Sequence, residues 1–524
     1  MQTSQRRTRA GTLRHAGFGV LATVVGLAAA HLVAALTVPA ASPVLAVGST
    51  VIDLTPTPLK EWAIRQFGTA DKLVLVGSVT VVVLVLAAVA GIVAARRETP
   101  GLLLVVALAG VAGLLAVLRP SAGPLDAVPA LVAAVVAVVS LWWLHRLDDR
   151  AHREDHRAEG PARTGLSFRV DGPSRRGVVL ASGGLAAAAV AMGAAGRRVT
   201  SYRLGGTDVA LPVAADPAST FPRGLEQRYA GITPLRTPTG EFYRVDTRLT
   251  VPAVDVDSWT LTIDGDVDQE VTLTFEDLAA MPTIERDITL TCVSNEVGGP
   301  YVGGARWLGV PLADVLARAG IGRTRADQIL STDVDGMTIS TPLDVALDGR
   351  DAMIAIGMNG GPLPRTHGFP ARMVVPGLYG FVSACKWITR MTLTTYDAEQ
   401  AYWTERDWAV DAPIKLSSRV DTPKPLSESP AGTVVIGGIA WAQGVGIEKV
   451  EVRIDGEAWQ QATLGPQVTD DYWRQWYLEW DAEPGQHFIA CRATNKDGEV
   501  QSDVRRTPFP EGSSGHQEIS VTVT

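Results

Sequence analysis

One cysteine and a pair of cationic side chains have the residue types best suited to chemistry in this 524-residue chain. Cys292 stands in the run Ile288-Thr289-Leu290-Thr291-Cys292-Val293-Ser294-Asn295-Glu296, and His367 and Arg372 lie five residues apart on a segment rich in Gly and Pro. A thiolate is a soft ligand for a metal, and Arg with His can bind one anion such as a phosphate. Taken alone, Cys292 fits a buried structural cysteine better, and the His–Arg pair could be structural too. The surrounding sequence must decide between these interpretations.

Two longer runs carry a resemblance to a known family. The first passes from Cys292 through a Gly-rich turn to Ala305-Arg306-Trp307-Leu308-Gly309-Val310-Pro311-Leu312. The second is Met358-Asn359-Gly360-Gly361-Pro362-Leu363-Pro364-Arg365-Thr366-His367-Gly368-Phe369-Pro370-Ala371-Arg372. Together they resemble the sulfite oxidase family of molybdopterin-dependent oxidoreductases, here as a membrane-anchored bacterial member. The resemblance covers roughly the last three-fifths of the chain, and its second run is highly specific.

The resemblance implies roles for individual residues. Cys292 would ligate molybdenum as a deprotonated thiolate, and His367 and Arg372 would bind the pterin of a molybdenum–molybdopterin cofactor. The segment from Tyr379 to Trp387 resembles the family's Gly-x-x-x-x-Lys-Trp cofactor loop with one extra residue, which makes Ser383 and Lys386 candidate pterin contacts.

Weaker matches extend the candidate site. Four residues match cofactor-edge positions: Tyr243, Arg244, Thr247 and Asp333. For Asp333 an acidic surface turn is an equal interpretation. Three further residues are expected near the substrate: Glu296, Arg306 and Trp307.

The sequence departs from sulfite oxidases beside the cysteine. Those enzymes follow it with Ala-Gly-Asn-Arg-Arg, whereas this chain has Val293-Ser294-Asn295-Glu296-Val297, and Ile356 replaces a Tyr before the Met-Asn-Gly run. The cation-rich oxyanion pocket is therefore not reproduced, and an acid near the metal would repel a dianion such as sulfite. Oxidation of a sulfite-like compound and reduction of a sulfoxide both remain open as the oxygen-atom transfer. A cofactor-free relic that serves assembly or signalling is the alternative from another class.

The first part of the chain, residues 1–197, is expected to hold about five transmembrane helices, because apolar runs of about 20 residues can cross a bilayer. Buried helices of a soluble protein are the alternative, which the scarcity of charge in these runs disfavours. The five runs lie near 17–41, 72–95, 101–118, 127–144 and 177–196.

Basic residues predict one orientation. They cluster before the first run, at Arg96-Arg97 and between His145 and Arg176, which puts these segments in the cytoplasm. Five crossings then place the residues beyond 197 outside the cytoplasm. Ser174-Arg175-Arg176 before the fifth run looks like an internal twin-arginine export signal, for which an ordinary basic flank is the alternative.

Net charge, cysteine content and histidine positions limit the classes of ligand and partner that the chain can bind. A net charge of −8 without a Lys/Arg stripe argues against nucleic acid, and three cysteines without a CxxC argue against a disulfide framework. His31 alone lies deep in a span, so we expect no haem between the helices. Electrons would therefore pass to or from a separate carrier, such as a cytochrome or a quinone-linked protein.

The domain prediction follows these composition changes. We expect a linker over 198–240 and an α+β molybdopterin domain over 241–410, with Thr274 as N-cap of a short helix. Short alternating strands over 411–524 predict a β-sandwich, which the resemblance implies to be an immunoglobulin-like dimerisation domain.

Overall fold

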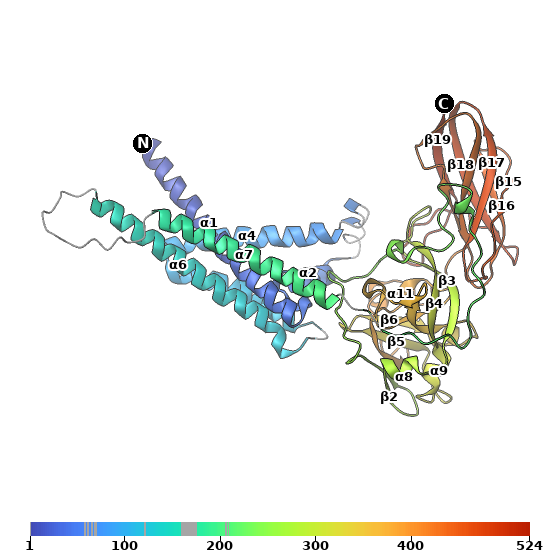
Figure 1. Ribbon diagram of the computed structural model, residues 1–524, viewed down its shortest axis with the longest axis horizontal. Coiled ribbons are helices and arrows are strands. Elements are labelled where there is room, and N and C mark those ends of the chain that lie inside the picture. Colours follow the sequence, from blue (N-terminus) through green and yellow to red (C-terminus); the bar gives the residue numbers. More distant parts are fainter. Residues whose placement is uncertain are drawn as a thin grey trace. The chain divides into compact units, whose positions relative to one another are not determined.

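The computed structural model describes residues 2–56, 59, 62–63, 66–67, 71–119, 122–158, 175–204, 207 and 209–524. Its contacts divide the chain into two compact units (Figure 1). The first, the helical unit, consists of Met1–Gly206 with Thr247–Val251, and the second, the catalytic unit, consists of Thr207–Asp246 with Pro252–Thr524. Part of the basic segment predicted to lie in the cytoplasm, residues 159–174, falls outside the described residues.

The helical unit is built from long apolar helices. They are α1 (Gln2–Leu36), α2 (Pro43–Leu54), α4 (Asp71–Arg96), α5 (Glu98–Val117), α6 (Val128–Ala158) and α7 (Arg175–Leu204). Five segments of the described residues are long and apolar enough to cross a membrane: Gly11–Leu36, Lys72–Arg96, Glu98–Val117, Pro124–Arg153 and Arg176–Arg203.

Small residues let these helices approach closely. An added Cβ on Gly19 of α1 would clash with the Ala87 carbonyl oxygen of α4, and one on Gly91 would meet the backbone of α1. Large apolar side chains point outward instead, with Val81 60% and Leu103 60% exposed. Small residues inside and large apolar residues outside are the arrangement of helices packed in lipid.

The catalytic unit begins with an α+β part made of two sheets and short helices. One sheet has the order β2 (Val271–Thr274), β1 (Thr260–Gly265), β10 (Ile388–Thr394), β5 (Gln328–Asp333) and β6 (Thr338–Pro342). The other has the order β3 (Ile284–Thr291), β4 (Val302–Pro311), β7 (Met353–Met358) and β8 (Gly361–Pro362), with β9 (Arg372–Val374) also paired to β7. The short helices are α8 (Phe275–Ala279), α9 (Leu312–Ala317), α10 (Leu343–Ala346) and α11 (Gly380–Ser383). Thr274 caps α8 in a capping box with Asp277, which confirms the predicted cap.

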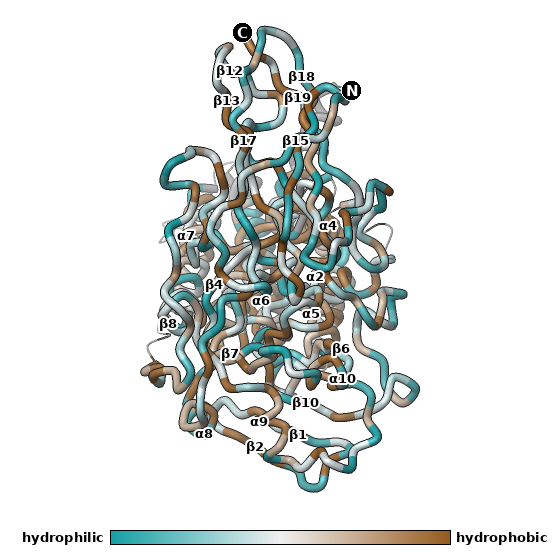
Figure 2. The backbone as a smooth tube through the Cα atoms, turned by 90° about the vertical axis from the view of Figure 1, so that its right-hand side faces the viewer, coloured by the Kyte–Doolittle hydropathy of each residue, from teal (hydrophilic) through white to brown (hydrophobic). Residues whose placement is uncertain are grey.

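The last part of the chain is β-rich and has two sheets. One sheet has the order β11 (Ser417–Thr422), β13 (Gly432–Trp441), β17 (Arg474–Ala482) and β16 (Thr463–Leu464). The other has the order β12 (Glu428–Ser429), β19 (Gln517–Val523), β18 (Gly485–Asn495), β14 (Ile447–Ile454) and β15 (Gln460–Gln461). Both sheets contribute to one core, in which Ile436, Val450 and Trp476 are fully buried. Buried residues alternate with more exposed ones along β14 and β19, as a strand with one buried face requires. Figure 2 shows the hydropathy of each residue along the backbone.

Residues 209–246 run along both β parts with little regular structure of their own. The Leu225 amide donates to Gln475 Oε1 at 2.7 Å and the Thr233 amide to Asp421 Oδ2 at 3.0 Å, which fixes the segment to the C-terminal part. The Thr237 amide donates to the Gly304 carbonyl of β4 at 2.9 Å. The predicted linker 198–240 thus consists of the end of α7, which continues to Leu204, and of this wrapping arm. The arm delivers Tyr243 and Asp246 to the site described next.

Candidate active site

Cys292 follows the last residue of β3, at the start of a tight loop that returns into β4. Its amide donates to the Tyr301 carbonyl at 3.0 Å, and its own carbonyl accepts from the Asn295 amide at 3.0 Å. Asn295 Oδ1 accepts from the Tyr301 amide at 2.8 Å, so the side chain closes the loop. Burial raises the pKa of the Cys292 thiol, while hydrogen bonds from the Ser294 amide and hydroxyl and the charge of Lys386 oppose the rise. The loop therefore holds a buried sulfur that already has donors for a thiolate.

His367, Arg372 and Lys386 meet where three short elements cross. His367 ends the 3-10 turn Arg365–His367, Arg372 begins β9, and the backbone of Arg372 pairs with that of Lys386. Arg372 Nη1 donates to the His367 carbonyl at 3.1 Å. Gly368 packs between them with φ +112°, and an added Cβ would lie 3.0 Å from the Arg372 Cβ and 3.2 Å from the Lys386 Cα. We call His367, Arg372 and Lys386 the cationic cradle.

Arg372 and Lys386 of the cradle are buried cations. Asp246 pairs with Lys386 at 2.8 Å and with Arg244 at 2.7 Å, so one carboxylate serves two cations. Burial lowers the pKa of Lys386 to about 8 and that of Arg372 to about 10. Burial, followed by the charges of Arg372 and Lys386, lowers the pKa of His367 to about 4. Buried cations with shifts in this direction are stabilised by an anion, and a phosphate-bearing pterin would supply one.

Aromatic rings join the cradle to the cysteine. Burial raises the pKa of Tyr243, as does the charge of Cys292, whereas Arg372 lowers it. Phe242 stacks on Tyr243 at 5.2 Å and meets His367 edge-on at 5.5 Å. The Arg372 guanidinium lies 5.1 Å from the centre of the Trp307 ring, a cation–π contact with a fully buried indole. Trp307 therefore acts on the site by supporting Arg372 from beneath.

The structure gives Arg306, which we expected near the substrate, ion-pair partners on β3. Arg306 pairs with Asp287 Oδ2 at 2.6 Å and with Glu285 at 3.5 Å. It lies directly opposite Asp287 in the β3–β4 ladder, whereas Thr291 pairs with Val302, which puts Arg306 about 13 Å along the strand from the Cys292 end. Complementary carboxylates on β3 hold it there.

Four other candidates take different positions. Ser383 donates its hydroxyl to the Leu378 and Tyr379 carbonyls at 3.0 and 3.1 Å, so its side chain closes the turn of α11. Asp333 is buried, and its Oδ1 accepts from the Asp335 and Met337 amides at 2.9 and 3.0 Å, so the carboxylate closes a turn that is not on the surface. Thr247 belongs to the short segment that groups with the helical unit. Glu296 is exposed on the Cys292 loop.

Sequence reasoning missed several residues that the structure brings to the site. Asp246 pairs with Lys386 across 140 positions of sequence, and no local pattern signals such a contact. Ser294 is different, because a hydroxyl two residues after a candidate metal-ligating cysteine is a recognisable local donor. Tyr379 also lies in range of the thiolate: burial, the charge of Cys292 and that of Glu511 raise its pKa to about 12 although the Lys415 amide donates to its hydroxyl.

Comparison with known proteins agrees with this geometry. The model of the oxidoreductase molybdopterin-binding domain family matches residues 248–403. Sulfite oxidase of Gallus gallus is 30% identical over 340 residues, which cover 56% of this chain and 72% of that enzyme. The chain belongs to the sulfite oxidase family. Mitochondrial sulfite oxidase of Rattus norvegicus is 32% identical over 317 residues, and the match spans 51% of this family member but only 57% of the rat enzyme. The crystal structure of the sulfane dehydrogenase SoxCD from Paracoccus pantotrophus is 22% identical, with a TM-score of 0.49 over 60% of this chain and 94% of that one.

Family membership makes this chain a molybdenum-dependent oxidoreductase with a molybdenum–molybdopterin cofactor. The residues fit the cofactor chemically, since the charge of Lys386, a buried cation of the cradle, acts on a buried sulfur that has donors for a thiolate. Gly368, on which a Cβ would crowd both Arg372 and Lys386, keeps that cradle open.

Proposed function

We propose that this protein is a membrane-anchored oxidoreductase that acts outside the cytoplasm and transfers an oxygen atom to or from a small sulfur or oxo compound at a molybdenum ligated by Cys292. The observation that carries the proposal is the juxtaposition of Cys292 with the cationic cradle. The charge of Lys386 acts on the Cys292 sulfur, and the charges of Arg372 and Lys386 act on His367. When bound, the cofactor supplies two-electron oxygen-atom transfer.

Each side chain has a distinct task in this proposal. The Cys292 sulfur ligates the metal, and the two Ser294 donors stabilise its negative charge. Arg372 and Lys386 neutralise the pterin phosphate, while His367, neutral at pH 7 because its pKa is about 4, donates or accepts one hydrogen bond. Tyr243 stays protonated because burial raises its pKa.

The redox balance requires a partner outside the described residues. Oxidation of a sulfur compound by this route takes one oxygen atom from water and releases two protons and two electrons. Reduction of a sulfoxide consumes two protons and two electrons and releases water. A separate carrier, a cytochrome or a quinone-linked protein, would exchange these electrons. Sulfite-like oxidation is the first candidate, and sulfoxide reduction is the second because Glu296 stands where sulfite oxidases have a cation.

The outward-facing apolar side chains of the helical unit support the membrane anchor. Five segments of suitable length and composition, together with basic residues in alternate connecting segments that all fall on the cytoplasmic side, favour a multi-pass protein with the catalytic unit outside the cytoplasm. The two-sheet C-terminal part supports an immunoglobulin-like sandwich that forms a homodimer, as the resemblance implies.

Metal analysis of the detergent-solubilised full chain tests the proposal. We expect about one molybdenum per chain, and we expect Cys292→Ser to remove oxygen-atom transfer while the protein stays folded. Cys491→Ser, in the core of the C-terminal sheets, is the matched control and should keep both metal and activity. Full activity of Cys292→Ser would refute ligation, and absence of molybdenum from protein made in a cofactor-competent host would favour the relic.

A further inference from the structure

Five aromatic rings meet where the α+β part joins the C-terminal part. The Trp408 ring lies at their centre, 5.6 Å from that of Phe381 and 5.2 Å from that of Phe509. Trp403 lies 5.9 Å from Trp408 and meets Tyr402 edge-on at 5.0 Å. Trp408 is buried, the rings around it are partly exposed, and Phe509 is 38% exposed. The cluster is therefore held from within by one indole and opens to solvent at its edge.

The segment that carries three of these rings is acidic. Residues 395–411 contain five acids and one basic residue, Arg406. Arg406 is engaged locally, because it pairs with Glu405 at 3.5 Å and lies 3.6 Å from the centre of the Tyr402 ring. All five acids are exposed: Asp397, Glu399, Glu405, Asp407 and Asp411. We call the five rings and these five acids the acidic aromatic face.

Neighbouring cations do not cancel this charge. Lys415 is paired with Glu511 at 3.1 Å. Arg505 and Arg506 lie in the segment before β19, and Arg505 Nη1 donates to the His516 carbonyl at 3.2 Å. Counted with these residues, six acids still face four cations. A partner with a basic surface would therefore be attracted to the acidic aromatic face.

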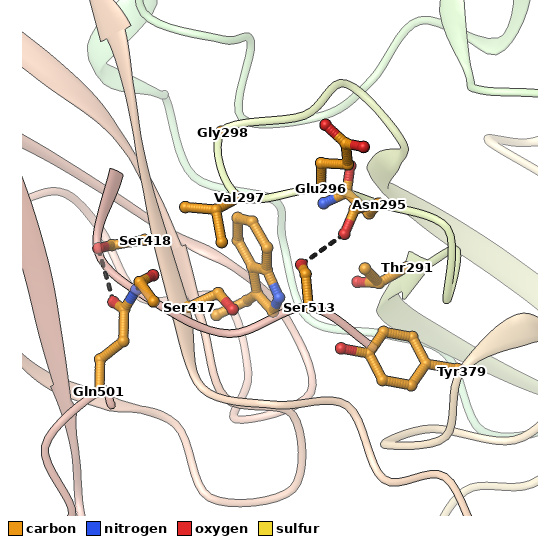
Figure 3. A pocket seen from close by; sticks show the side chains of 12 residues that line it. Thr291, Asn295, Glu296, Val297, Gly298, Tyr379, Ser417, Ser418, Gln501 and Ser513 are labelled. Carbon is orange, nitrogen blue, oxygen red and sulfur yellow. Dashed lines mark hydrogen bonds between the residues drawn. The ribbon is translucent and has the colours of Figure 1, made fainter. Parts of the chain in front are cut away.

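The face adjoins the Cys292 loop through α11. Phe381 is the second residue of this helix, and an added Cβ on the first, Gly380, would lie 3.9 Å from the Thr291 carbonyl oxygen. Thr291 directly precedes Cys292. Tyr379, just before α11, lines a small cavity together with Thr291 (Figure 3). A route of packed atoms thus runs from the Cys292 loop to the ring cluster.

The loop before β19 makes a second connection. Ser513, four residues after Phe509, donates its hydroxyl to the Asn295 carbonyl of the Cys292 loop at 2.6 Å, as a dashed line in Figure 3 shows. The Pro510 carbonyl accepts from the Ala409 amide at 3.3 Å, which fixes the loop to the acidic segment. These bonds order the face in advance, and preorganisation lowers the cost of binding a partner.

We propose that the acidic aromatic face is the docking surface for a one-electron carrier protein whose redox group is surrounded by basic residues. The inference rests on the proposed function, which requires a separate carrier, and it names where that carrier binds and which charge it presents. Exposed aromatic side chains are enriched at protein interfaces, and opposite charges accelerate encounter. In substrate oxidation, two oxidised carriers would dock in turn and accept one electron each, while two protons pass to solvent. In substrate reduction, two reduced carriers would each donate one electron.

The first test measures binding without turnover. Calorimetry would titrate the detergent-solubilised, molybdenum-loaded full chain with a small basic c-type cytochrome and, separately, with an acidic one. We expect only the basic cytochrome to bind, with a Kd that rises about tenfold between low salt and about 0.3 M salt. An acidic cytochrome that binds equally well would overturn the inference.

Substitution of two acids locates the binding surface. Asp407→Asn with Asp411→Asn should raise the Kd of the basic cytochrome about tenfold at low salt. Asp407 has φ +64°, which Asn also adopts, so the turn should keep its shape. Glu457→Gln with Asp497→Asn removes the same charge from exposed turns of the C-terminal sheets and should leave the Kd unchanged. Equal affinities in the two double variants would overturn the inference.

The second test measures turnover. Phe509→Ser should raise the KM for the basic cytochrome about tenfold and leave turnover with a small artificial electron dye unchanged, because the dye needs no docking surface. Loss of dye turnover in this variant, or a change of its oligomeric state in light scattering, would overturn the inference by assigning Phe509 to the active site or to a homodimer contact. Absence of dye turnover in the molybdenum-loaded wild-type protein would instead overturn the proposed function, whatever the binding data show.

Discussion

Lys386 shows how one buried charge ties cofactor binding to pH. Burial holds its pKa at about 8, below the ordinary value of 10.5, although Asp246 lies 2.8 Å away. Because the pKa of Lys386 is lower in the folded, cofactor-free protein than in the unfolded chain, folding favours the neutral amine. The resulting contribution to the free energy of unfolding is fully present above the unfolded pKa of 10.5 and is lost as the pH falls through about 8. A bound anion reverses this preference because it stabilises the ammonium.

We therefore predict that anion affinity of the cofactor-free cradle falls as the pH rises above about 8, by up to tenfold per pH unit. Calorimetric titration of cofactor-free protein with sulfate between pH 7 and pH 10 measures this, since sulfate keeps its charge throughout. Lys386→Arg should flatten the profile between pH 7 and pH 9, because even the buried Arg372 guanidinium of the cradle has a pKa of about 10. An unchanged profile in that variant would assign the pH dependence to another group.

At the residue scale, the run from Met358 to Arg372 predicted the site well because residues that contact one another lie close together in this part of the sequence. His367, Gly368 and Arg372 form one local unit, and Lys386 joins it through backbone pairing, so their residue types and spacing already predict an anion site. Arg306 lies in an equally suggestive run, yet the register of β3 against β4 places Asp287 opposite it. Register is set by pairing across the sheet, which short sequence runs do not encode.

At the element scale, the turn that joins His367 to β9 depends on Gly368. Its φ of +112° and its close approach to Arg372 and Lys386 impose two separate requirements on this position. Gly360, in the preceding turn, has φ +84° with nothing within 4 Å of an added Cβ, so it shares only the first requirement.

We predict that Gly368→Ala destabilises the protein by about 2–4 kcal/mol and lowers its molybdenum content, whereas Gly360→Ala costs about 1 kcal/mol and keeps the metal. Thermal unfolding with metal analysis of both variants measures the difference. Equal losses in the two variants would show that backbone strain alone, and not the crowding of the cradle, limits this position.

Elements were predictable to different degrees for physical reasons. Thr274 was recognisable as a cap because a capping box is local, and the apolar helices because length and composition define them. The arm over 209–246 was not, because it owes its position to single hydrogen bonds with Gln475, Asp421 and Gly304 and has no periodicity of its own. Asp246 could not be predicted as a site residue for the same reason, because its partner Lys386 is distant in the sequence.

At the scale of the whole molecule, the order of segments makes a prediction about export. Under the proposed topology, α7 (Arg175–Leu204) is the last span before the catalytic unit, and Arg175-Arg176 opens it. We predict that Arg175→Lys with Arg176→Lys leaves the catalytic unit in the cytoplasm, because a twin-arginine signal needs guanidinium groups whereas a positive flank needs only charge. A phosphatase reporter fused after Thr524, active only outside the cytoplasm, measures this.

Arg96→Lys with Arg97→Lys is the matched control, since this pair follows a span without opening an export signal. The control should remain exported with full reporter activity. Normal export of the Arg175/Arg176 variant would reduce that pair to ordinary flanking charges.

The hydrogen bond from Ser513 to the Asn295 carbonyl bears on how the protein is made. A ribosome reaches Ser513 218 residues after Asn295, and Gln517, whose side chain would meet an added Cβ on Gly298 of the same loop, comes later still. The wall behind Cys292 therefore stays unfinished while the early helices have long since emerged. Biogenesis must pass through an intermediate in which the helical unit is complete and the catalytic unit still waits for its last strand.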